Sequence, residues 1–489
     1  MSNKFYITTA IDYVNASPHI GHAYEKIITD ALARWEKISG KDVFFLTGAD
    51  ENAQKNAQAA KSNGVDTKTF VDKNSKEFID LCKELNLSNN DFIKTTEERH
   101  VKVAQQMFQK IFDKGDIYKK SYSGLYCEGC EAFLTGRDLI DGKCLEHKKE
   151  PKLIEEENYF FKLSKYEKEI LELTSSENFI VPEGFKNEIV NRIKSDGLRD
   201  ISVSRPGLSW GIDVPIDKDH KIYVWIDALS NYISALDYPD GDKFKKYWPA
   251  DIHVVGKGIN WFHSVIWPAL LMSAEIELPK TILVHGYLTF NGEKISKSLG
   301  NSINPSEIIE KYGVDPVRYS LIRDIPFNQD GDFSENSLKA RSNGELSNDL
   351  GNLISRTLTL CEKYFEGKLS SQKNDGLFDN LDLKKIQTYM EKYELHHALD
   401  EVWNLIRSSN KYVNDKEPWK NEEGREIVMY NLLEAIRAIS ILVSPFIPET
   451  SDRINSQLGI ESGNLEDLKF GLKKEYHVKK EGVLFKKLK

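Results

Sequence analysis

The first third of the chain alternates between short apolar runs and an amphipathic helical pattern. Residues 5–11 alternate in hydrophobicity and are predicted to form a strand. A loop with Pro18 follows, then apolar residues recur at helical spacing up to Gly40, which suits a helix C-terminus. Residues 43–46 form a compact apolar run typical of a buried parallel strand. This order predicts the start of a doubly wound α/β nucleotide-binding domain.

The pattern changes near Gly115. Short pieces containing Cys and Gly, then charged helical stretches, occupy the chain to about Asp200. Strand-like apolar runs return at residues 222–226, 252–255 and 281–284. We therefore predict a split α/β domain that is interrupted by an insertion.

Strand signals disappear beyond about residue 334. Amphipathic helices are predicted at residues 346–361, 395–413 and 427–443. Pro445 and Pro448 are expected to end the last of them. The pattern favours an all-α C-terminal domain, followed by a short basic surface tail at residues 485–489.

Composition narrows the class of protein. The 489 residues are 40% hydrophobic, enough for roughly two to four folded domains. No apolar run approaches the roughly 18 residues of a membrane helix, and the start lacks a signal-peptide pattern, so we expect a cytoplasmic protein with no membrane partner. The net charge of −9 argues against a simple nucleic-acid binder, although a local basic face can still hold phosphates.

The string His19-Ile20-Gly21-His22 lies between the first predicted strand and its helix. In such folds this is the ligand crevice, where the helix dipole and free N–H groups favour phosphate. Gly21 has no Cβ, so a flat base could lie against the backbone. Two imidazoles can donate hydrogen bonds to a phosphate as charge develops on it. The alternative is a pair of capping or core histidines.

A second string, Lys294-Ile295-Ser296-Lys297-Ser298, follows the turn signal Asn291-Gly292. Two lysines three residues apart on a loop can clamp a pyrophosphate and neutralise its growing charge. The alternative is a solvated Lys/Ser loop in a Lys-rich chain.

Four potential zinc ligands cluster in the insertion: Cys127, Cys130, Cys144 and His147. Paired ligands two residues apart fit knuckle turns around a tetrahedral Zn²⁺. Four protein ligands close the coordination sphere, so we expect a structural metal. Buried or redox-active cysteines are the alternative. Cys82 and Cys361 stand alone and are expected to be buried thiols.

The histidine and lysine strings together resemble the HIGH and KMSKS signatures of class I aminoacyl-tRNA synthetases, and the zinc knuckle resembles that of the methionyl-tRNA synthetases. The resemblance covers essentially the whole chain. It implies five segments: two halves of a catalytic nucleotide-binding domain (1–114 and 221–290), an inserted connective domain with the zinc knuckle (115–220), a lysine-loop and stem-contact region (291–335), and a helical anticodon-binding domain (336–489).

Three further blocks, at residues 9–15, 223–232 and 262–268, look like the methionine-specific members of the family. They imply a methionine pocket in which Asp50 binds the ammonium group and Arg205 supports the site. The other implied pocket residues are Ile11, Tyr13, Trp225, Ala228, Leu229, Tyr232, Ile259, Phe262 and His263. Aromatic rings attract a polarizable sulfur, which agrees with a thioether substrate. Taken singly, each aromatic residue is better explained by ordinary core packing, and the three blocks together reverse this preference.

The resemblance also implies an ATP site, a tRNA site and a reaction. Catalysis falls to His19, His22, Lys294 and Lys297. The ATP contacts are these four together with Gly21, Gly256, His285 and Gly286. Asn352, Arg356 and Trp419 are the implied anticodon contacts. The implied reaction uses ATP and Mg²⁺ to activate L-methionine as methionyl-adenylate, then transfers methionine to the 3′-terminal adenosine of tRNA(Met).

Some positions depart from the family pattern. Ile295 stands for the usual Met, Asn52-Ala53 for a common His-Gly pair, and Gly258 for a common Asp, which puts one substrate or ribose contact in question. No appended C-terminal module is visible, so a monomer is expected. Two alternatives stay open: another class I synthetase, and a non-catalytic RNA-binding relative that zinc holds together. The enzymes for leucine, isoleucine and valine need a large editing insertion, which this chain is too short to contain. The cysteine enzyme needs a zinc site with an open coordination position, which four protein ligands would not leave.

Overall fold

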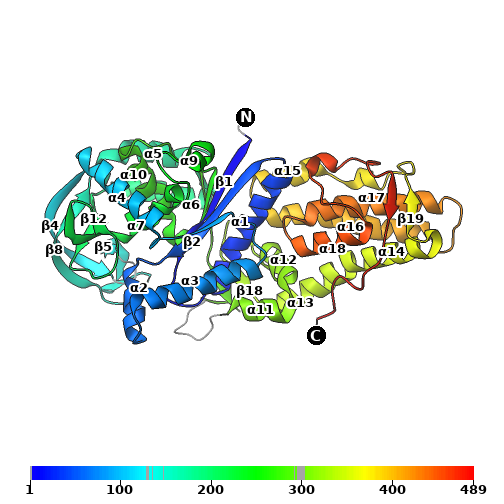
Figure 1. The fold of residues 1–489 in the computed structure, drawn as a ribbon, viewed down its shortest axis with the longest axis horizontal. Coiled ribbons are helices and arrows are strands. Elements are labelled where there is room, and N and C mark those ends of the chain that lie inside the picture. The colour runs from blue at the N-terminus through cyan, green and yellow to red at the C-terminus, as the bar shows by residue number, and fades with distance from the viewer. Residues whose placement is uncertain are drawn as a thin grey trace.

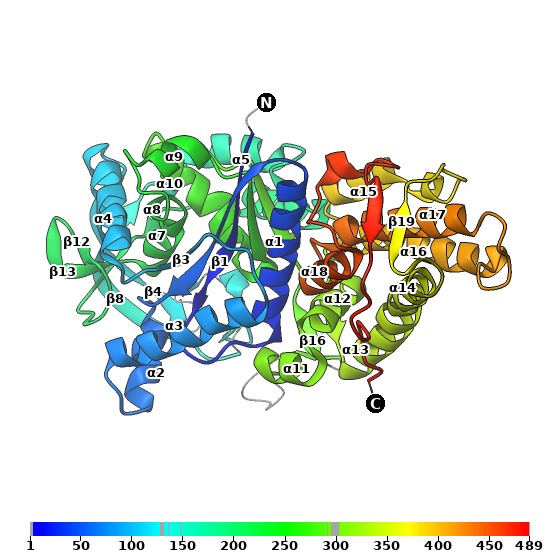
Figure 2. The same ribbon diagram turned by 45° about the vertical axis from the view of Figure 1, so that its right-hand side comes forward.

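The structure is a computed structural model that describes residues 3–127, 132–134, 136–146, 148–290, 292–294 and 303–488. The molecule is elongated, with an α/β part towards one end and a helical part towards the other (Figure 1). Helix α1 (Ile20–Ile38) lies between the two parts in both views (Figure 2). No helix among these residues combines the length and the apolar character that a bilayer crossing requires.

A six-stranded parallel sheet forms the centre of the α/β part, in the order β3-β2-β1-β14-β15-β9. In chain order the strands are β1 (Lys4–Tyr13), β2 (Asp42–Asp50), β3 (Asp91–Lys94), β9 (Ile180–Val181), β14 (Ile252–Gly256) and β15 (Thr281–His285). The predicted strands at residues 5–11, 43–46, 252–255 and 281–284 are confirmed. Strand order reverses direction between β1 and β14, the position where doubly wound folds bind ligands.

Successive residues of the central strands contribute to two different apolar cores. Ile7 and Val254 belong to the core that joins the sheet to α1 and to the C-terminal helices. Tyr6 and Val255 belong to the core on the opposite face. Because side chains alternate along a strand, a sheet with a core on each face must be apolar at nearly every position, as these strands are.

The first half of the domain also contains α2 (Gln54–Ser62), α3 (Thr67–Glu84) and α4 (Glu98–Asp113). The segment after α4 builds a separate sheet in the order β10-β8-β4-β5, whose long antiparallel pair is β4 (Ile117–Cys127) and β8 (Lys152–Phe161). The same segment of the chain also contains β5 (Ala132–Leu134), β6 (Leu139–Ile140), β7 (Lys143–Cys144), α5 (Glu167–Ser175), α6 (Glu183–Asp196) and β10 (Ile201–Ser202). Between α5 and α6 the chain returns to the central sheet as β9.

The strand predicted at residues 222–226 is wrong. Strand β13 (Asp217–Ile222) ends there, and the apolar run continues as the helices α7 (Val224–Leu229) and α8 (Asn231–Ser234). All six residues of α7 are buried. A short helix that is buried on every side has the same uniform apolar pattern as a buried strand, so periodicity could not separate them. The neighbouring elements are β11 (Ser204–Pro206), β12 (Asp213–Val214), α9 (Asp242–Tyr247) and α10 (Trp267–Ser273).

A small sheet and two helices connect the α/β part to the helical part. They are β16 (Leu288–Phe290), β17 (Glu293–Lys294), β18 (Gly331–Phe333), α11 (Pro305–Tyr312) and α12 (Val314–Asp324). A continuous helical segment follows, made of α13 (Glu335–Arg341), a π-helical stretch (Ser342–Gly351) and α14 (Asn352–Phe365). The remaining helices are α15 (Leu383–Glu391), α16 (Leu395–Lys416), α17 (Arg425–Val443) and α18 (Pro448–Leu458).

The three predicted C-terminal helices are confirmed, but the all-α description needs correction. Strands β19 (Lys368–Ser370) and β20 (Glu475–His477) pair across more than a hundred residues of sequence. Two three-residue strands carry too little periodicity to be detected. Pro448 begins α18, in keeping with the preference of proline for the first helical turn. The tail also packs down, since Asn343 exchanges two hydrogen bonds with the backbone of Leu488, at 2.8 and 2.9 Å.

Candidate active site

Residues predicted for the nucleotide and amino-acid sites lie at the carboxyl ends of neighbouring parallel strands. Ile11 and Tyr13 end β1, Asp50 ends β2, and Gly256 and His285 end β14 and β15. The helix α1, with His19 at its N-cap, begins on the same side of the β1–β14 switch point. Segments far apart in sequence thus meet at one crevice.

His19 and His22 form a reciprocal capping box at the start of α1. The Gly21 N–H donates to His19 Nδ1 at 3.1 Å, and the His19 N–H donates to His22 Nδ1 at 3.0 Å. The two rings stack with centroids 3.7 Å apart. Because each Nδ1 accepts from the backbone, each neutral ring must carry its proton on Nε2. Two Nε2–H donors on stacked rings therefore stand at a helix N-terminus, where an anion is also favoured.

A buried ion pair lies beneath this helix start. Lys26 Nζ is 2.5 Å from Asp12 Oδ2, and His22 Nε2 is 3.9 Å from Asp12 Oδ1. Burial alone would lower the pKa of Lys26, but the Asp12 carboxylate reverses this and leaves the pKa raised. The pair joins β1 to α1 between two residues predicted to touch the amino acid, Ile11 and Tyr13. Sequence reasoning did not identify it, although an Asp inside an otherwise apolar strand was a detectable signal.

The predicted amino-acid pocket has an aromatic wall. Trp225 and Phe262 stack with centroids 3.7 Å apart and planes 11° apart. Tyr13 meets Trp225 edge-on, with centroids 6.4 Å apart. Ala228 and Leu229 share α7 with Trp225, and all three are buried. The short helix replaces the predicted strand and supplies these side chains to one place.

Tyr232 and His263 form a polar pair in this wall. His263 Nδ1 lies 2.9 Å from the Ile259 carbonyl, so Nδ1 donates there and Nε2 is left to accept. The Tyr232 hydroxyl donates to His263 Nε2 at 2.7 Å. Burial lowers the pKa of His263 to about 4, against smaller opposing effects of the Ile259 hydrogen bond and Glu25. The pair is therefore neutral at physiological pH and presents no charge to a thioether.

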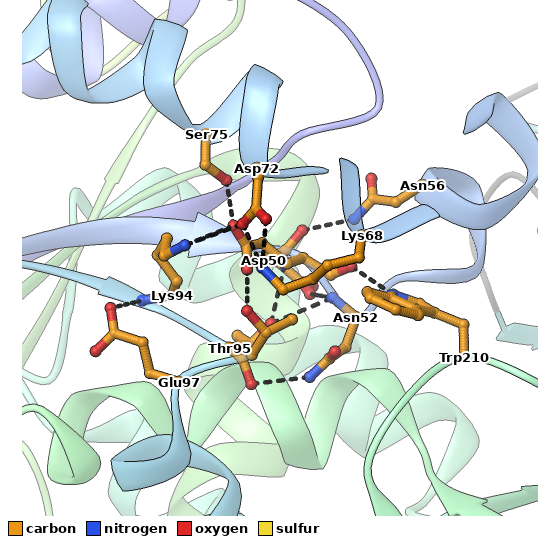
Figure 3. Close-up of polar contacts among 12 residues, drawn as sticks. Asp50, Asn52, Asn56, Lys68, Asp72, Ser75, Lys94, Thr95, Glu97 and Trp210 are labelled. Carbon is orange, nitrogen blue, oxygen red and sulfur yellow. Dashed lines mark hydrogen bonds and ion pairs between the residues drawn. The ribbon is translucent and has the colours of Figure 1, made fainter. Parts of the chain in front are cut away.

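The Asp50 carboxylate is held at the end of β2 by its own loop. Its Oδ1 accepts from the Asn52 N–H at 3.1 Å, and the Asp50 carbonyl accepts from Asn56 Nδ2 at 2.8 Å. Asn52 also donates from Nδ2 to the Thr95 carbonyl at 3.0 Å (Figure 3). Asp50 is nearly completely buried, so its charge favours a cationic partner such as an ammonium group.

Glu51, next to Asp50, is fully buried and belongs to the loop structure rather than to the crevice. It accepts from the Ser75 hydroxyl at 2.5 Å and lies 3.5 Å from Lys94 Nζ. Its carbonyl accepts from Trp210 Nε1 at 2.8 Å. These contacts fix the backbone that carries Asp50.

One glycine predicted for the ATP site, Gly286, leaves no room for a side chain. A Cβ on Gly286 would lie 2.2 Å from the Gln329 carbonyl oxygen, so only glycine fits. His285 Nδ1 donates to the Gly286 carbonyl at 2.7 Å, and its Nε2 pairs with Glu25 Oε2 at 3.0 Å. The predicted ATP residues Gly256, His285 and Gly286 are thus held by two adjoining strand ends.

At Gly258, which departs from the family pattern, the space that a side chain would need is occupied by Tyr287. A Cβ at this position would lie 2.4 Å from the Tyr287 hydroxyl. The neighbouring Lys257 ammonium pairs with Asp330 at 2.7 Å and lies 4.5 Å from the centroid of the Tyr287 ring. Asp330 thus supplies a carboxylate beside Lys257 from another part of the chain.

Parts of the lysine string and the zinc cluster lie outside the described residues. Lys297, Cys130 and His147 are among them, and for Lys294 only the backbone, in β17, is described. Cys127 and Cys144 are both buried. The Cys144 carbonyl accepts from the Lys148 N–H at 2.8 Å, and Lys148 has a φ of 55°, which makes a tight turn around Cys144. This turn and the two thiols fit a zinc knuckle, while the described residues alone contain no cluster of three metal-binding side chains.

Arg205 stabilises the inserted sheet next to the crevice. Its guanidinium makes two contacts with Glu156, at 3.0 and 3.1 Å, and lies 4.0 Å from the centroid of the Tyr126 ring. It lines a narrow cavity with Asn52 and Trp210. This position, beside the loop after Asp50, agrees with a supporting role.

The predicted anticodon residues lie together on the helical part. Arg356 lies on α14 with its guanidinium 4.3 Å from the centroid of the Trp419 ring, and donates to Asn414 Oδ1 at 2.5 Å. Asn352 is exposed one turn away and lines an open groove with Arg356 and Thr359. Side-chain amides, a guanidinium and an aromatic face are the groups that bind unpaired bases.

Comparison with known families agrees with this geometry. A family model described as tRNA synthetases class I (M) matches residues 5–149 and 135–358, and one described as the anticodon-binding domain of tRNA ligase matches residues 380–482. The methionine–tRNA ligase of Caldanaerobacter subterraneus subsp. tengcongensis is 45% identical over 508 residues, spanning 100% of this chain and 79% of the relative. That of Thermotoga maritima is 46% identical, spanning 94% of this chain and 76% of the relative.

Solved structures show the same architecture over the whole chain. Mycobacterium tuberculosis methionyl-tRNA synthetase in complex with methionyl-adenylate superposes with a TM-score of 0.95 at 38% identity, covering 99% of this chain and 100% of that one. The apo form of the same protein gives a TM-score of 0.88 at 35% identity, covering 100% and 99%.

Proposed function

The chain belongs to the methionyl-tRNA synthetases of the class I tRNA synthetase family, and on this basis we propose how its residues carry out the reaction. The protein is a methionine–tRNA ligase. It uses ATP to activate methionine as methionyl-adenylate and then transfers methionine to the 3′-terminal adenosine of tRNA(Met).

One observation carries the assignment of roles. The paired Nε2–H donors of His19 and His22 stand at the switch point of the sheet, on the side where the Trp225–Phe262 wall lies close to the end of β1. A nucleotide phosphate at the start of α1 would therefore lie near the carboxylate of an amino acid whose side chain is against that wall. This is the arrangement that adenylate formation needs.

Methionine binds, in this proposal, with its two ends in different environments. The Asp50 carboxylate pairs with the ammonium group. The thioether lies among Ile11, Tyr13, Trp225, Ala228, Leu229, Tyr232, Ile259, Phe262 and His263. Sulfur–aromatic contacts contribute roughly 0.3–1.5 kcal/mol each, and the neutral Tyr232–His263 pair adds a polar contact that distinguishes sulfur from a methylene.

In the first step a methionine carboxylate oxygen forms a bond to the α-phosphorus of ATP, and the bond from that phosphorus to the bridging oxygen of pyrophosphate breaks. His19, His22, Lys294 and Lys297 stabilise the charge that spreads over the phosphate oxygens. Gly21, Gly256, His285 and Gly286 contact the nucleotide at the start of α1 and at the ends of β14 and β15. Mg²⁺ on the phosphates supplies further neutralisation when ATP is bound.

In the second step the terminal adenosine of tRNA attacks the methionyl carbonyl through its 2′-hydroxyl, as expected for class I, and AMP leaves with the electron pair of the broken anhydride bond. Asn352, Arg356 and Trp419 bind anticodon bases on the helical part, which we assign to residues 336–489. Residues 1–114 and 221–290 form the catalytic domain, 115–220 the connective insertion and 291–335 the lysine-loop and stem-contact region.

The insertion is proposed to hold a structural Zn²⁺ through Cys127, Cys130, Cys144 and His147. When bound, the metal would supply folding energy to the segment between residues 127 and 147. Arg205 supports the adjoining sheet. A cytoplasmic location and a monomeric state stay predictions, and light scattering on the purified protein tests the second.

Amino-acid-dependent exchange of pyrophosphate into ATP tests the whole proposal. Each of the twenty amino acids is supplied in turn, and methionine alone is expected to support rapid exchange. Exchange driven better by cysteine, leucine, isoleucine or valine would identify another class I specificity. ATP binding without exchange for any amino acid would support a non-catalytic RNA-binding protein.

A further inference from the structure

Asn52 makes contacts in two directions. Its backbone N–H donates to Asp50 Oδ1 at 3.1 Å, and its side chain donates from Nδ2 to the Thr95 carbonyl at 3.0 Å (Figure 3). The same Nδ2 donates to Asp227 Oδ2 at 2.9 Å. An amide nitrogen has two protons, so these two acceptors use its donor capacity completely.

Asp227 continues the contact into the pocket helices. It lies on α7, two residues from Trp225 and one from Ala228, and is 1% exposed. Its Oδ1 lies 2.8 Å from His100 Nε2 on α4. A carboxylate accepts, so His100 donates from Nε2, and its Nδ1 accepts from the Ser234 hydroxyl at 2.9 Å. Ser234 lies on α8, which also carries Tyr232.

This network is closed to solvent and tightly specified. His100 and Ser234 are fully buried, and Asn52 is 8% exposed. A buried carboxylate that loses one donor retains an unsatisfied charge, so the network resists displacement of any member. It joins the strand ends that hold Asp50 and Thr95 to the helices that hold Trp225 and Tyr232.

We propose that Asn52 and Asp227 are positioning residues that set the distance between the ammonium-binding carboxylate and the thioether-binding wall. This inference rests on the proposed methionine site and deepens it. Neither residue touches methionine. They act through Asp50 at one end of the substrate and through α7 at the other, so their loss should weaken a ligand that uses both ends more than a ligand that uses the thioether end alone.

The test compares methionine with 4-(methylthio)butanoate, which has the thioether and carboxylate but no ammonium group. We measure the KM of methionine and the inhibition constant of the analogue in pyrophosphate exchange. Asn52→Ala should raise the KM of methionine by about 10- to 100-fold, the range for losing a hydrogen bond to a charged group. The inhibition constant of the analogue should rise less than about 3-fold, because the displaced Asp50 contributes little to its binding. The KM of ATP should stay within about 2-fold.

A double-mutant cycle tests whether the two residues act together. Asp227→Asn should raise the KM of methionine as well, and Asn52→Ala/Asp227→Asn should resemble the larger single effect rather than the product of both. Asn52→His keeps an N–H donor towards Asp227 and should restore the KM to within about 3-fold of the wild type. If Asn52→Ala does not fold, methionine and the analogue are compared in Asp227→Asn and Asn52→His instead.

Asn431 provides a matched control. It is a fully buried amide in α17 whose Nδ2 donates to the Lys373 carbonyl at 2.9 Å and to the Ile427 carbonyl at 2.8 Å. Asn431→Ala should lower thermal stability and leave the KM of methionine unchanged. Equal weakening of methionine and the analogue, independent effects in the cycle, or a KM change in the control as large as in Asn52→Ala would overturn the inference. Absence of methionine-dependent exchange in the wild type would instead overturn the proposed function.

Discussion

Asp30 and Arg318 form an ion pair that is completely buried, with 2.7 Å between Asp30 Oδ2 and Arg318 Nη2. Asp30 lies on α1, the helix that begins at His19, and Arg318 lies on α12. Arg318 also donates to the carbonyls of Leu85, Pro445 and Phe446, at 2.8–3.1 Å. One guanidinium therefore joins α1 to the turn between α17 and α18 in the helical part.

Arg318→Met is expected to lower the free energy of unfolding by about 3–5 kcal/mol, because it leaves the Asp30 carboxylate buried without its main partner. Urea unfolding followed by circular dichroism measures this change. Lys76→Met is the matched control, since its ion pair with Asp80 is largely exposed and should contribute at most about 1 kcal/mol. A loss for Arg318→Met no larger than for the control would contradict the role of this pair as the join between the two parts.

The two ring nitrogens of His22 have different roles: Nδ1 caps α1, and Nε2 is the group proposed to stabilise the transition state. Asn at this position places an acceptor oxygen where Nδ1 accepts from the His19 N–H, but has no group at the position of Nε2. His22→Asn should therefore keep the helix start and lower the kcat of pyrophosphate exchange by roughly 10²–10³-fold. Melting temperature and exchange rate are measured on the same preparation. Retained activity would exclude His22 from transition-state stabilisation.

His263 makes the protein sensitive to acid in a defined window. Burial depresses its pKa in the folded state to about 4, below the ordinary value near 6.5, so the folded protein favours the neutral ring. The stabilisation is complete above pH 6.5 and is lost as the pH falls from there through about 4, for a total of about 3 kcal/mol. His253 also packs against Tyr232 and burial lowers its pKa as well, so the two groups act in the same direction.

His263→Gln removes one of these two titrations. Between pH 7 and pH 5 the variant should lose about 2 kcal/mol less unfolding free energy than the wild type, whatever its stability at pH 7. Urea titrations at half-unit pH intervals give both curves. Parallel curves would mean that His263 is already accessible to protons in the folded state.

Much of the fold could be predicted from short apolar runs, because a parallel sheet with a core on each face needs nearly continuous hydrophobic strands. Residues 252–255 and 281–284 are of this kind. The same rule failed at residues 222–226, where α7 is buried on every side. The Asn52–Asp227 contact joins residues 175 positions apart and has no local pattern at all. Pairings of this kind are decided by tertiary packing, as is the Asp12–Lys26 pair.

Removal of zinc should unfold the knuckle segment between residues 127 and 152 without unfolding the central sheet. Zinc-finger-like segments lose their structure when the metal leaves, whereas the central sheet has its own cores on both faces. We expect about one zinc per chain by atomic emission, and loss of it after Cys144→Ser or Cys127→Ser. Limited proteolysis should then cut between residues 127 and 152 first.

Cys361→Ser is the control, because this thiol is buried in the helical part. Wild-type protein that contains no zinc after purification with zinc-supplemented buffers would contradict the assignment.

The groove on α14 provides the last prediction, which separates the two chemical steps. Arg356, on α14, is held over Trp419 and beside Asn414, and α14 lies in the helical part, away from α1 (Figure 1). Trp419→Ala removes a stacking surface worth roughly 1–3 kcal/mol per base, so the KM for tRNA(Met) should rise by about 5- to 150-fold. Pyrophosphate exchange needs no tRNA and should be unchanged. Arg407→Ala, on the exposed side of α16, is the control and should change neither. A fall in exchange with Trp419→Ala would mean that the residue stabilises the fold, and an unchanged KM for tRNA would remove this groove from the anticodon site.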